Sequence, residues 1–311
     1  MRNLNQDTIT QAVIERFSKT PDPRLKEIIT SLVQHLHAFA REVHLSHHEW
    51  RQAIAFLHRV GNISDDTRSE FTLLSDVLGL SSLVDLMHSR PGATPGSVLG
   101  PFHTVGSPWR DNPVNLVGHN AGERVWLRGR VLGPKGQPLS QAVLDVWQNA
   151  ANGQYWQMDP SQPEDNLRCR LRLDAQGGYA IATIRPMPYC IPTDGPVWKD
   201  LVEPAGRSAW RPAHFHVIVE APGYRTLITE VFDESDLYLD SDAVFGVREA
   251  LIGRYEDVDD AQAAQALGVA GATGAAGASV SACASRNMRV RAGPSINSRL
   301  RPCANARASL E

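Results

Sequence analysis

Two histidines two positions apart, His214 and His216, have the spacing that most directly suggests chemistry. The residues that follow them, 217–219, are Val, Ile and Val, and β-branched side chains favour a strand. Residues i and i+2 of a strand point to the same face. Both imidazoles can therefore bind a single metal ion.

A second His-x-His pair, His35 and His37, provides a comparison within the same chain. Apolar residues around it recur at helical spacing between Ile28 and Phe39. Residues i and i+2 of a helix diverge, so these imidazoles are expected on a helix surface or in a core, and not at a shared ion.

Two tyrosines are candidate ligands for the same ion. Tyr155 and Tyr189 each lie in a turn-rich segment that follows a strand-like run. Either one alone is explained as an amphipathic residue that covers the edge of a core. Phenolate, however, is a hard anionic donor that favours a trivalent ion, so two phenolates and two imidazoles would form a mononuclear ferric site. The alternatives are a zinc- or copper-binding β-sandwich, a metal-dependent hydrolase, or a structural module without activity.

Four motifs together resemble the intradiol ring-cleavage dioxygenases, in their order and in their spacing. They are Asp145–Gln148, Gly153–Tyr155, Pro188–Pro192 and Arg211–His216. The resemblance extends from about residue 24 to about residue 256, and the combination is far more specific than any single motif.

Two further segments, Val98–Phe102 and Tyr238–Val247, are similar to the hydroxyquinol 1,2-dioxygenase branch of that family. This similarity implies that the chain cleaves hydroxyquinol (benzene-1,2,4-triol) with O2 at a non-haem Fe(III) to give maleylacetate. The alternative within the family is a catechol or chlorocatechol 1,2-dioxygenase that gives cis,cis-muconates.

The resemblance also implies a role for each site residue. Tyr155, Tyr189, His214 and His216 would bind Fe(III), and an aromatic vicinal diol would displace Tyr189, which then accepts a substrate proton. Arg211 would stabilise negative charge on the ring. Its odd offset from His214 places it on the opposite face of a regular strand, where a surface ion pair is the alternative, unless Pro212 bends the chain.

A substrate pocket can be carried over from the hydroxyquinol enzymes. Glu230 departs from the family, in which Gln or His is typical; its carboxylate could accept a proton, disfavour anionic substituents or face solvent. Asp76 could accept a hydrogen bond from a third hydroxyl of the substrate, or lie exposed at a helix end. The complete set of expected pocket residues is Leu73, Asp76, Val98, Leu99, Gly100, Pro101, Phe102, Ile191, Pro192, Glu230 and Val244.

The expected fold is mainly β: an antiparallel β-sandwich catalytic domain at 96–260, preceded by an α-helical region at 1–95. Helices are predicted from Leu25 to Val43, from the capping box Ser46–Glu49 through Leu57, and from Thr67 to Leu78. Residues 261–311, rich in Ala, Gly and Ser, are expected to be a low-complexity, disordered tail that the fold does not need. Strands are predicted at 124–132, 141–147, 167–173, 178–184, 212–220 and 225–232.

Composition excludes some partners. The net charge of −3 includes no basic stripe, so no nucleic acid is expected. No apolar run approaches the ~20 residues that span a bilayer, and no signal peptide is evident, so a cytoplasmic protein without a membrane partner is expected. The four cysteines form no CxxC pair and should be reduced thiols. The family resemblance implies a homodimer through the N-terminal helices, with a lipid able to bind between them.

Overall fold

The computed structural model describes residues 2–257 and 281–290 of the 311-residue chain. The chain divides into two compact units, Met1–Arg59 and Val60–Glu311. This boundary lies well before residue 95, where the sequence analysis placed the end of the helical region. The fourth and fifth helices therefore belong to the unit that contains the sheets.

The first unit is helical, and local sequence signals begin its helices. Asp22 caps α2 by accepting bonds from the backbone N–H groups of Arg24 and Leu25, at 2.8 and 3.2 Å. The predicted capping box before α3 is confirmed, because Glu49 N–H donates to Ser46 Oγ and Ser46 N–H donates to Glu49 Oε2. The helices are α1 (Ile9–Arg16), α2 (Pro23–Glu42) and α3 (His47–Ile63), the last of which ends in the second unit.

The comparison pair of histidines lies on α2, as predicted. His35 is exposed, whereas His37 is half-buried and its Nδ1 lies 3.1 Å from the Thr10 hydroxyl of α1. The same helix exposes a row of apolar side chains, each 47–59% exposed within the chain: Leu25, Ile28, Leu32, Leu36, Phe39 and Val43.

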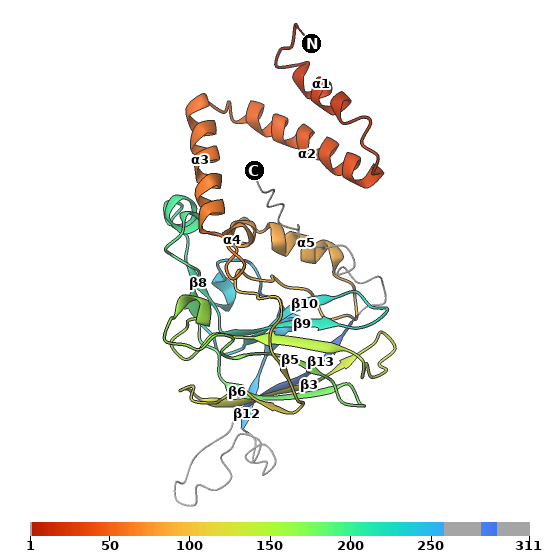
Figure 1. Cartoon of the computed structure of the whole chain (residues 1–311), viewed down its shortest axis with the longest axis vertical. Helices are drawn as coiled ribbons and strands as arrows, with labels where there is room; N and C mark the ends of the chain where they lie inside the picture. The colour runs from red at the N-terminus through yellow and green to blue at the C-terminus, as the bar shows by residue number, and fades with distance from the viewer. Residues whose placement is uncertain (1, 258–280, 291–311) are drawn as a thin grey trace, which may run out of the picture. The chain divides into compact units, whose positions relative to one another are not determined.

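The second unit is a sandwich of two sheets, which lie against each other in Figure 1. The first sheet has the order β1-β5-β4-β9-β10-β11 and the second has the order β12-β13-β3-β6-β2. The six long strands predicted from sequence are confirmed as β3 (Arg124–Leu132), β4 (Val143–Trp147), β5 (Arg168–Arg172), β6 (Gly178–Ile184), β9 (His214–Glu220) and β10 (Leu227–Asp233).

Short strands make both sheets mixed, and two more, β7 and β8, form a separate two-stranded sheet. Pairings among the six long strands are antiparallel, as expected, but β1, β2 and β11 join their neighbours in parallel. The short strands are β1 (Trp109–Arg110), β2 (Val114–Asn115), β7 (Tyr189–Cys190), β8 (Trp210–Arg211), β11 (Ile252–Gly253) and β12 (Tyr255–Asp257).

The hydrophobic core lies between the two sheets. Phe215, Val217 and Val219 of β9 pack there with Leu127 of β3 and Ile181 of β6, all of them buried. Because strand side chains alternate, His214, His216 and Ile218 point to the other face of the first sheet. The candidate metal ligands are therefore outside the main core, on a sheet face that loops must cover.

The expectation of a tail without a core is wrong for residues 281–290. Ser281–Arg289 forms β13, parallel to β3 and antiparallel to β12, and Met288 and Val290 are buried in the main core. The sequence did not predict this strand because β13 lacks the alternating aliphatic residues of the other strands. Residues 261–280 and 291–311 lie outside the described residues.

Truncation should distinguish these parts of the tail. A chain that ends at residue 290 should keep its stability, whereas one that ends at residue 260 should lose at least ~3 kcal/mol, since two side chains of about 1.5 kcal/mol or more leave the core. Urea unfolding of both chains and of the full-length protein measures the difference. Equal midpoints for the two truncated chains would show that β13 contributes nothing to the core.

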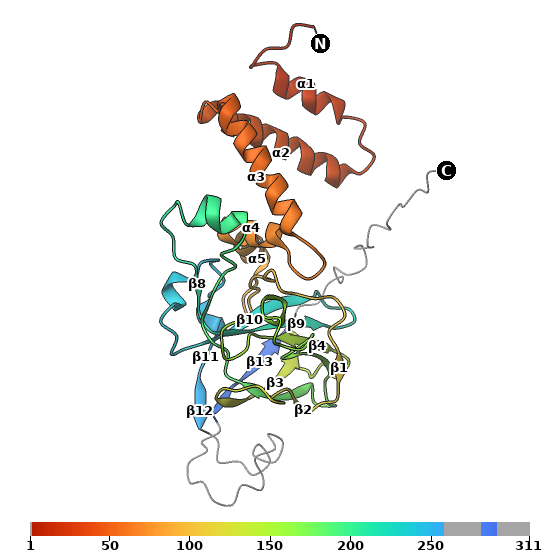
Figure 2. The ribbon, with the colours of Figure 1, turned by 60° about the vertical axis from the view of Figure 1, so that its left-hand side comes forward.

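Helices α4 (Glu70–Val77) and α5 (Leu80–His88) lie on the β10 side of the sandwich in both ribbon views (Figures 1 and 2). Arg207 donates to the carbonyl of Val77 at 2.6 Å, and the Ser82 hydroxyl donates to the carbonyl of Phe245 at 2.8 Å. In the part of the chain that the structure describes, no single helix is long and apolar enough to cross a membrane, although α4 and α5, bent by 72°, meet that test as a pair.

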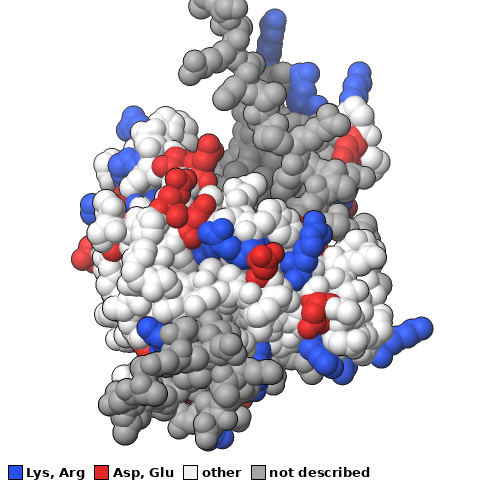
Figure 3. Space-filling view, turned by 60° about the horizontal axis from the view of Figure 1, so that its bottom comes forward, with Lys and Arg blue, Asp and Glu red and all other residues white. Residues whose placement is uncertain are grey.

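The surface has mixed charge. On the face drawn in Figure 3, acidic and basic side chains lie next to one another, and neither sign covers the face continuously. This distribution matches the near balance of 31 Lys and Arg against 34 Asp and Glu in the sequence.

Candidate active site

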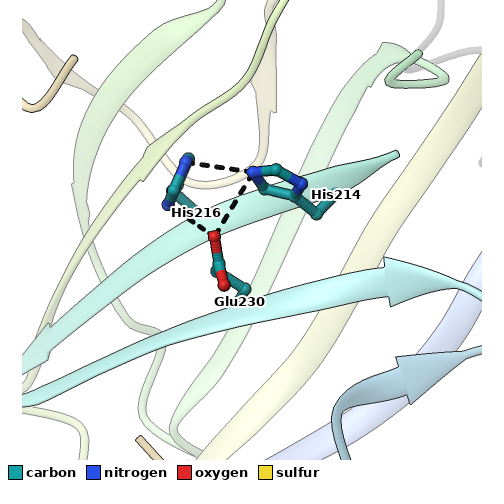
Figure 4. A group of neighbouring side chains, drawn as sticks. All are labelled: His214, His216 and Glu230. Atoms are coloured by element: carbon teal, nitrogen blue, oxygen red, sulfur yellow. Dashed lines mark hydrogen bonds and ion pairs between the residues drawn. The ribbon is translucent and has the colours of Figure 1, made fainter. Parts of the chain in front are cut away.

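Two imidazoles and a carboxylate converge on the outer face of the first sheet. His214 and His216 lie on β9 as predicted, and their Nε2 atoms are 3.1 Å apart. Antiparallel register places Glu230 of β10 opposite His216, and Glu230 Oε1 lies 3.3 Å from His214 Nε2 and 3.3 Å from His216 Nδ1. Figure 4 shows the three side chains pointing toward one another. All three are buried and close enough to hold one ion.

The two predicted tyrosines cover this cluster, Tyr155 from a loop and Tyr189 from the short strand β7. Tyr155, just before a short 3-10 helix, is buried edge-on to Tyr189, with ring centroids 5.3 Å apart. Tyr189 of β7 is also buried, and its ring centroid lies 5.6 Å from that of His214. The structure therefore brings together all four residues that the sequence singled out as metal ligands.

Arg211 joins the cluster, contrary to the regular-strand alternative. Pro212 separates it from β9, and Arg211 belongs to β8, which pairs with β7 in register with Tyr189. The guanidinium is buried, with Nη1 3.1 Å from His214 Nε2 and 3.5 Å from the Tyr189 hydroxyl. A surface ion pair is thus the wrong interpretation of this residue.

Two carboxylates hold the Arg211 side chain. Asp242 accepts from Nε at 3.0 Å and from Nη2 at 3.4 Å, and Glu230 Oε1 lies 2.9 Å from Nη2. Backbone N–H groups of Val244 and Gly246 also donate to Asp242. Sequence reasoning missed Asp242 as a site residue, although it lies inside the quoted Tyr238–Val247 segment.

Burial determines the protonation of the cluster. It lowers the pKa of His214 to about 3 and that of His216 well below its ordinary value, so both imidazoles are neutral at pH 7 and offer lone pairs. Burial also raises the phenol pKa of Tyr155 and Tyr189 above the ordinary value. The pKa of Glu230 rises to about 7 for the same reason, with Arg211 opposing the rise.

A cavity of about 270 Å³ opens beside the tyrosines. Three of the predicted pocket residues, Phe102, Ile191 and Pro192, line it together with Tyr155 and Tyr189. The other predicted residues do not line this cavity. Among them, Val98, Leu73 and Val244 are buried, Leu99 packs against the cluster of Phe102, Trp147 and the two tyrosines, and the Pro101 carbonyl accepts from the Ser69 N–H.

Gly100 has a specific reason to be glycine. Its φ is +74°, a conformation that L side chains rarely adopt, and an added Cβ would lie 2.9 Å from His216 Cε1. The predicted Val98–Phe102 segment therefore passes directly over the imidazole of His216.

Phe102 is held over the site by a stacked ring and by two side-chain donors. Its ring stacks on Tyr155 with centroids 4.7 Å apart. Its carbonyl accepts from Arg168 Nη2 at 2.6 Å and from Gln157 Nε2 at 2.9 Å. Arg168 lies on β5 and is buried, because the buried carbonyl of Phe102 needs its guanidinium as a donor.

Comparison with known proteins identifies the family. A family model described as dioxygenase matches residues 98–272, and one described as catechol dioxygenase N terminus matches residues 22–94. This chain is an intradiol ring-cleavage dioxygenase. The resemblance stated from its motifs is thus confirmed.

Named relatives of this dioxygenase have similar lengths. It is 46% identical over 255 residues to 6-chlorohydroxyquinol 1,2-dioxygenase of Cupriavidus pinatubonensis, which covers 81% of this chain and 92% of the relative. It is 40% identical over 259 residues to hydroxyquinol 1,2-dioxygenase of Nocardioides simplex, covering 82% and 87%. The solved hydroxyquinol 1,2-dioxygenase of Pseudomonas putida has a TM-score of 0.75 and 42% identity, covering 93% of this chain and 99% of that one.

Asp76 of the dioxygenase is buried, which excludes an exposed position at a helix end. In the described part of the chain, neither of its carboxylate oxygens accepts a hydrogen bond. Burial raises its pKa to about 6; the Ser81 hydroxyl and the Arg211 charge oppose this rise, and the Asp242 charge adds to it. A buried carboxylate without a partner is unfavourable unless a ligand supplies one.

Asp76 should also make the stability of the dioxygenase depend on pH. Its folded pKa of about 6 lies above the ordinary 3.8, so its stabilisation is complete below pH 4 and is lost as pH rises through 6. Asp76→Asn should therefore reduce the decline in unfolding free energy between pH 4 and pH 7 by roughly 2–3 kcal/mol. Urea titrations of both proteins at the two pH values measure this. Parallel pH profiles would show that Asp76 is not the titrating group.

Proposed function

We propose that this dioxygenase cleaves hydroxyquinol with O2, between the two carbons that carry its vicinal hydroxyls, at a mononuclear Fe(III), and that the ring-opened product tautomerises to maleylacetate. The observation that carries the proposal is the convergence of His214, His216, Tyr155 and Tyr189 in one buried cluster. The names of its relatives support hydroxyquinol as the substrate.

The residues of the cluster fit iron, and we propose these four as its ligands. The two neutral imidazoles offer lone pairs, and the buried Tyr155 hydroxyl has no hydrogen-bond partner within bonding geometry among the described residues. A cation at this point would favour the phenolate over the phenol and so reverse the effect of burial on the tyrosines. Bound Fe(III) would supply a Lewis acid that holds the diol and activates it toward O2.

Protein side chains around the bound diol would accept its protons and stabilise its negative charge. Tyr189 can accept a substrate proton when the diol replaces it, because Arg211 Nη1 next to its hydroxyl stabilises the anionic side chain beforehand. The same guanidinium remains beside His214 as negative charge develops on the ring. Phe102, Ile191 and Pro192 supply apolar walls of the cavity against which the ring can pack.

Asp76 is the proposed source of selectivity for the third hydroxyl. Its oxygens are buried, without hydrogen-bond partners and outside the cavity beside the tyrosines, so a third hydroxyl would reach them only if the substrate extends past that cavity; the contact would then relieve an unfavourable burial. A polar pair of this kind can discriminate by ~100-fold or more against an analogue that lacks the hydroxyl.

Oxygen uptake with benzene-1,2,4-triol, catechol and a chlorocatechol tests the proposal. We expect the highest kcat/KM with the triol, and a smaller triol-to-catechol ratio for Asp76→Asn. A higher kcat/KM with catechol or the chlorocatechol would assign the chain to that branch. If the ratio is unchanged in Asp76→Asn, selectivity comes from pocket shape and ring electronics.

We also propose a homodimer through the N-terminal helices, with a lipid bound between them. The apolar row on α2, from Leu25 to Val43, is about half exposed in the single chain, which supports a partner surface there. Light scattering at micromolar concentration should give twice the chain mass, and extraction with organic solvent followed by mass spectrometry should detect the lipid. A monomer would reject both.

A further inference from the structure

His216 has one buried polar atom without a hydrogen bond, and it faces the Glu230 carboxylate. His216 Nδ1 has no hydrogen-bond partner in the described part of the chain, whereas Glu230 Oε1 is already ion-paired with Arg211 Nη2 at 2.9 Å. His216 Nδ1 and Glu230 Oε1 lie 3.3 Å apart, slightly beyond ordinary hydrogen-bonding distance (Figure 4). Buried polar atoms are nearly always paired, so a small adjustment of either side chain would satisfy His216 Nδ1.

The Nδ1 atom of the other histidine, His214, already has a hydrogen-bond partner. His214 Nδ1 lies 2.7 Å from the carbonyl oxygen of Pro212, which can only accept. The proton of this ring is therefore on Nδ1, and its Nε2 carries the lone pair that points into the site. His216 presents its Nε2 to the same point, but the acceptor beside its Nδ1 is the Glu230 carboxylate.

Glu230 is held in position from both of its oxygens. The Ser97 hydroxyl donates to Oε2 at 2.5 Å, and Arg211 Nη2 lies 2.9 Å from Oε1. Arg211 is also bound through two nitrogens by Asp242, which balances its charge. When Glu230 is ionised, the cluster of Arg211, Glu230 and Asp242 carries one negative charge in excess, adjacent to the imidazole of His216.

We propose that Glu230 is a positioning residue for the metal ligand His216: its carboxylate accepts the Nδ1–H, fixes the tautomer and leaves the Nε2 lone pair for the ion. This inference rests on the proposed function, in which His216 binds iron. A carboxylate bonded to the far nitrogen of a ligating imidazole makes the near nitrogen a stronger donor. The two ligands then differ, since His214 is paired with a neutral carbonyl and His216 with a charged carboxylate.

Two substitutions separate the hydrogen bond from the charge. Glu230→Gln keeps an oxygen that can accept the bond but removes the charge, and Glu230→Met keeps similar volume but removes both. The readout is the rate at which excess EDTA removes iron, followed by loss of the visible tyrosinate-to-Fe(III) absorption expected for the proposed ligands, and thermal midpoints confirm that each variant is folded. We expect Glu230→Met to release iron about 10–100-fold faster than the wild type, with Glu230→Gln in between.

Glu70→Gln is the matched control, because it neutralises a buried carboxylate that is ion-paired with Arg68 and not with a residue of the metal cluster. Its release rate should stay near that of the wild type. Equal rates for the wild type and Glu230→Met overturn the inference, as do equal rates for Glu230→Gln and Glu230→Met, or a Glu70→Gln rate as fast as that of Glu230→Met.

Cobalt separates a failure of the inference from a failure of the proposed function. The same four proteins are loaded with Co(II), and its absorption spectrum and release rate are followed without substrate. A wild-type chain that binds Co(II) but not iron counts against the proposed function alone, and the order of Co(II) release rates still tests Glu230. A change in the coordination spectrum between the wild type and Glu230→Met would show that Glu230 binds the ion itself, which overturns the positioning role.

Discussion

Replacing His214 with alanine should lower the iron content of the purified protein more than ~10-fold and abolish the red-brown colour that tyrosinate-to-Fe(III) charge transfer would give, since a buried imidazole donor is lost. Tyr189→Phe should keep much more iron but lose ~100-fold or more in kcat, because a proton acceptor affects the chemical step more than metal binding. Elemental analysis, the visible spectrum and steady-state oxygen uptake measure these effects.

The chain contains a matched control for this experiment. His35 is also part of a His-x-His pair, but it is exposed on α2, so His35→Ala should change neither iron content nor turnover. Normal turnover by Tyr189→Phe would reject the displaced-ligand role, and a colourless wild-type protein that contains zinc would reject the ferric site.

Arg211→Met should destabilise the protein by ~3–5 kcal/mol at pH 7, because it leaves the Glu230 and Asp242 carboxylates buried without their cation. Arg211→Lys should lose less, since it keeps the charge but cannot bind Asp242 through two nitrogens. Urea unfolding of the metal-free proteins measures stability separately from iron binding.

Arg24→Met is the control for loss of an arginine ion pair. Arg24 pairs with Glu27 at 2.6 Å on the exposed surface of α2, and such a pair contributes only ~0–1 kcal/mol. If Arg211→Met were no more destabilising than Arg24→Met, the buried cluster would have to be compensated in the folded state, for example by protonation of Glu230.

Local patterns were sufficient to predict the elements that contain the histidines and the shared face of His214 and His216. Strand alternation and the capping box at Ser46 depend on residues within a few positions, so their physical causes are present in the sequence itself. The tyrosine ligands could not be predicted from periodicity, because the segments around them have no regular period. The family motifs identified them.

Contacts across the sheet could not be predicted from local pattern. Glu230 faces His216 because β9 and β10 pair in one particular register, and a shift of one residue would turn Glu230 to the other face. Arg211 reaches the site because Pro212 interrupts the strand and β8 pairs with β7. Arg168 is buried because its guanidinium donates to the carbonyl of Phe102. Strand β13 enters the core although its sequence has no alternation of aliphatic residues.

Periodicity, capping and motif spacing are properties of neighbouring residues, so they were enough to predict the family, the six long strands and the four candidate ligands. The surroundings of those ligands came from the fold: the Arg211–Asp242–Glu230 cluster, the buried Asp76 and the unpaired Nδ1 of His216. Burial and strand register result from many long-range contacts acting together, and these set the charge and hydrogen bonding of each side chain.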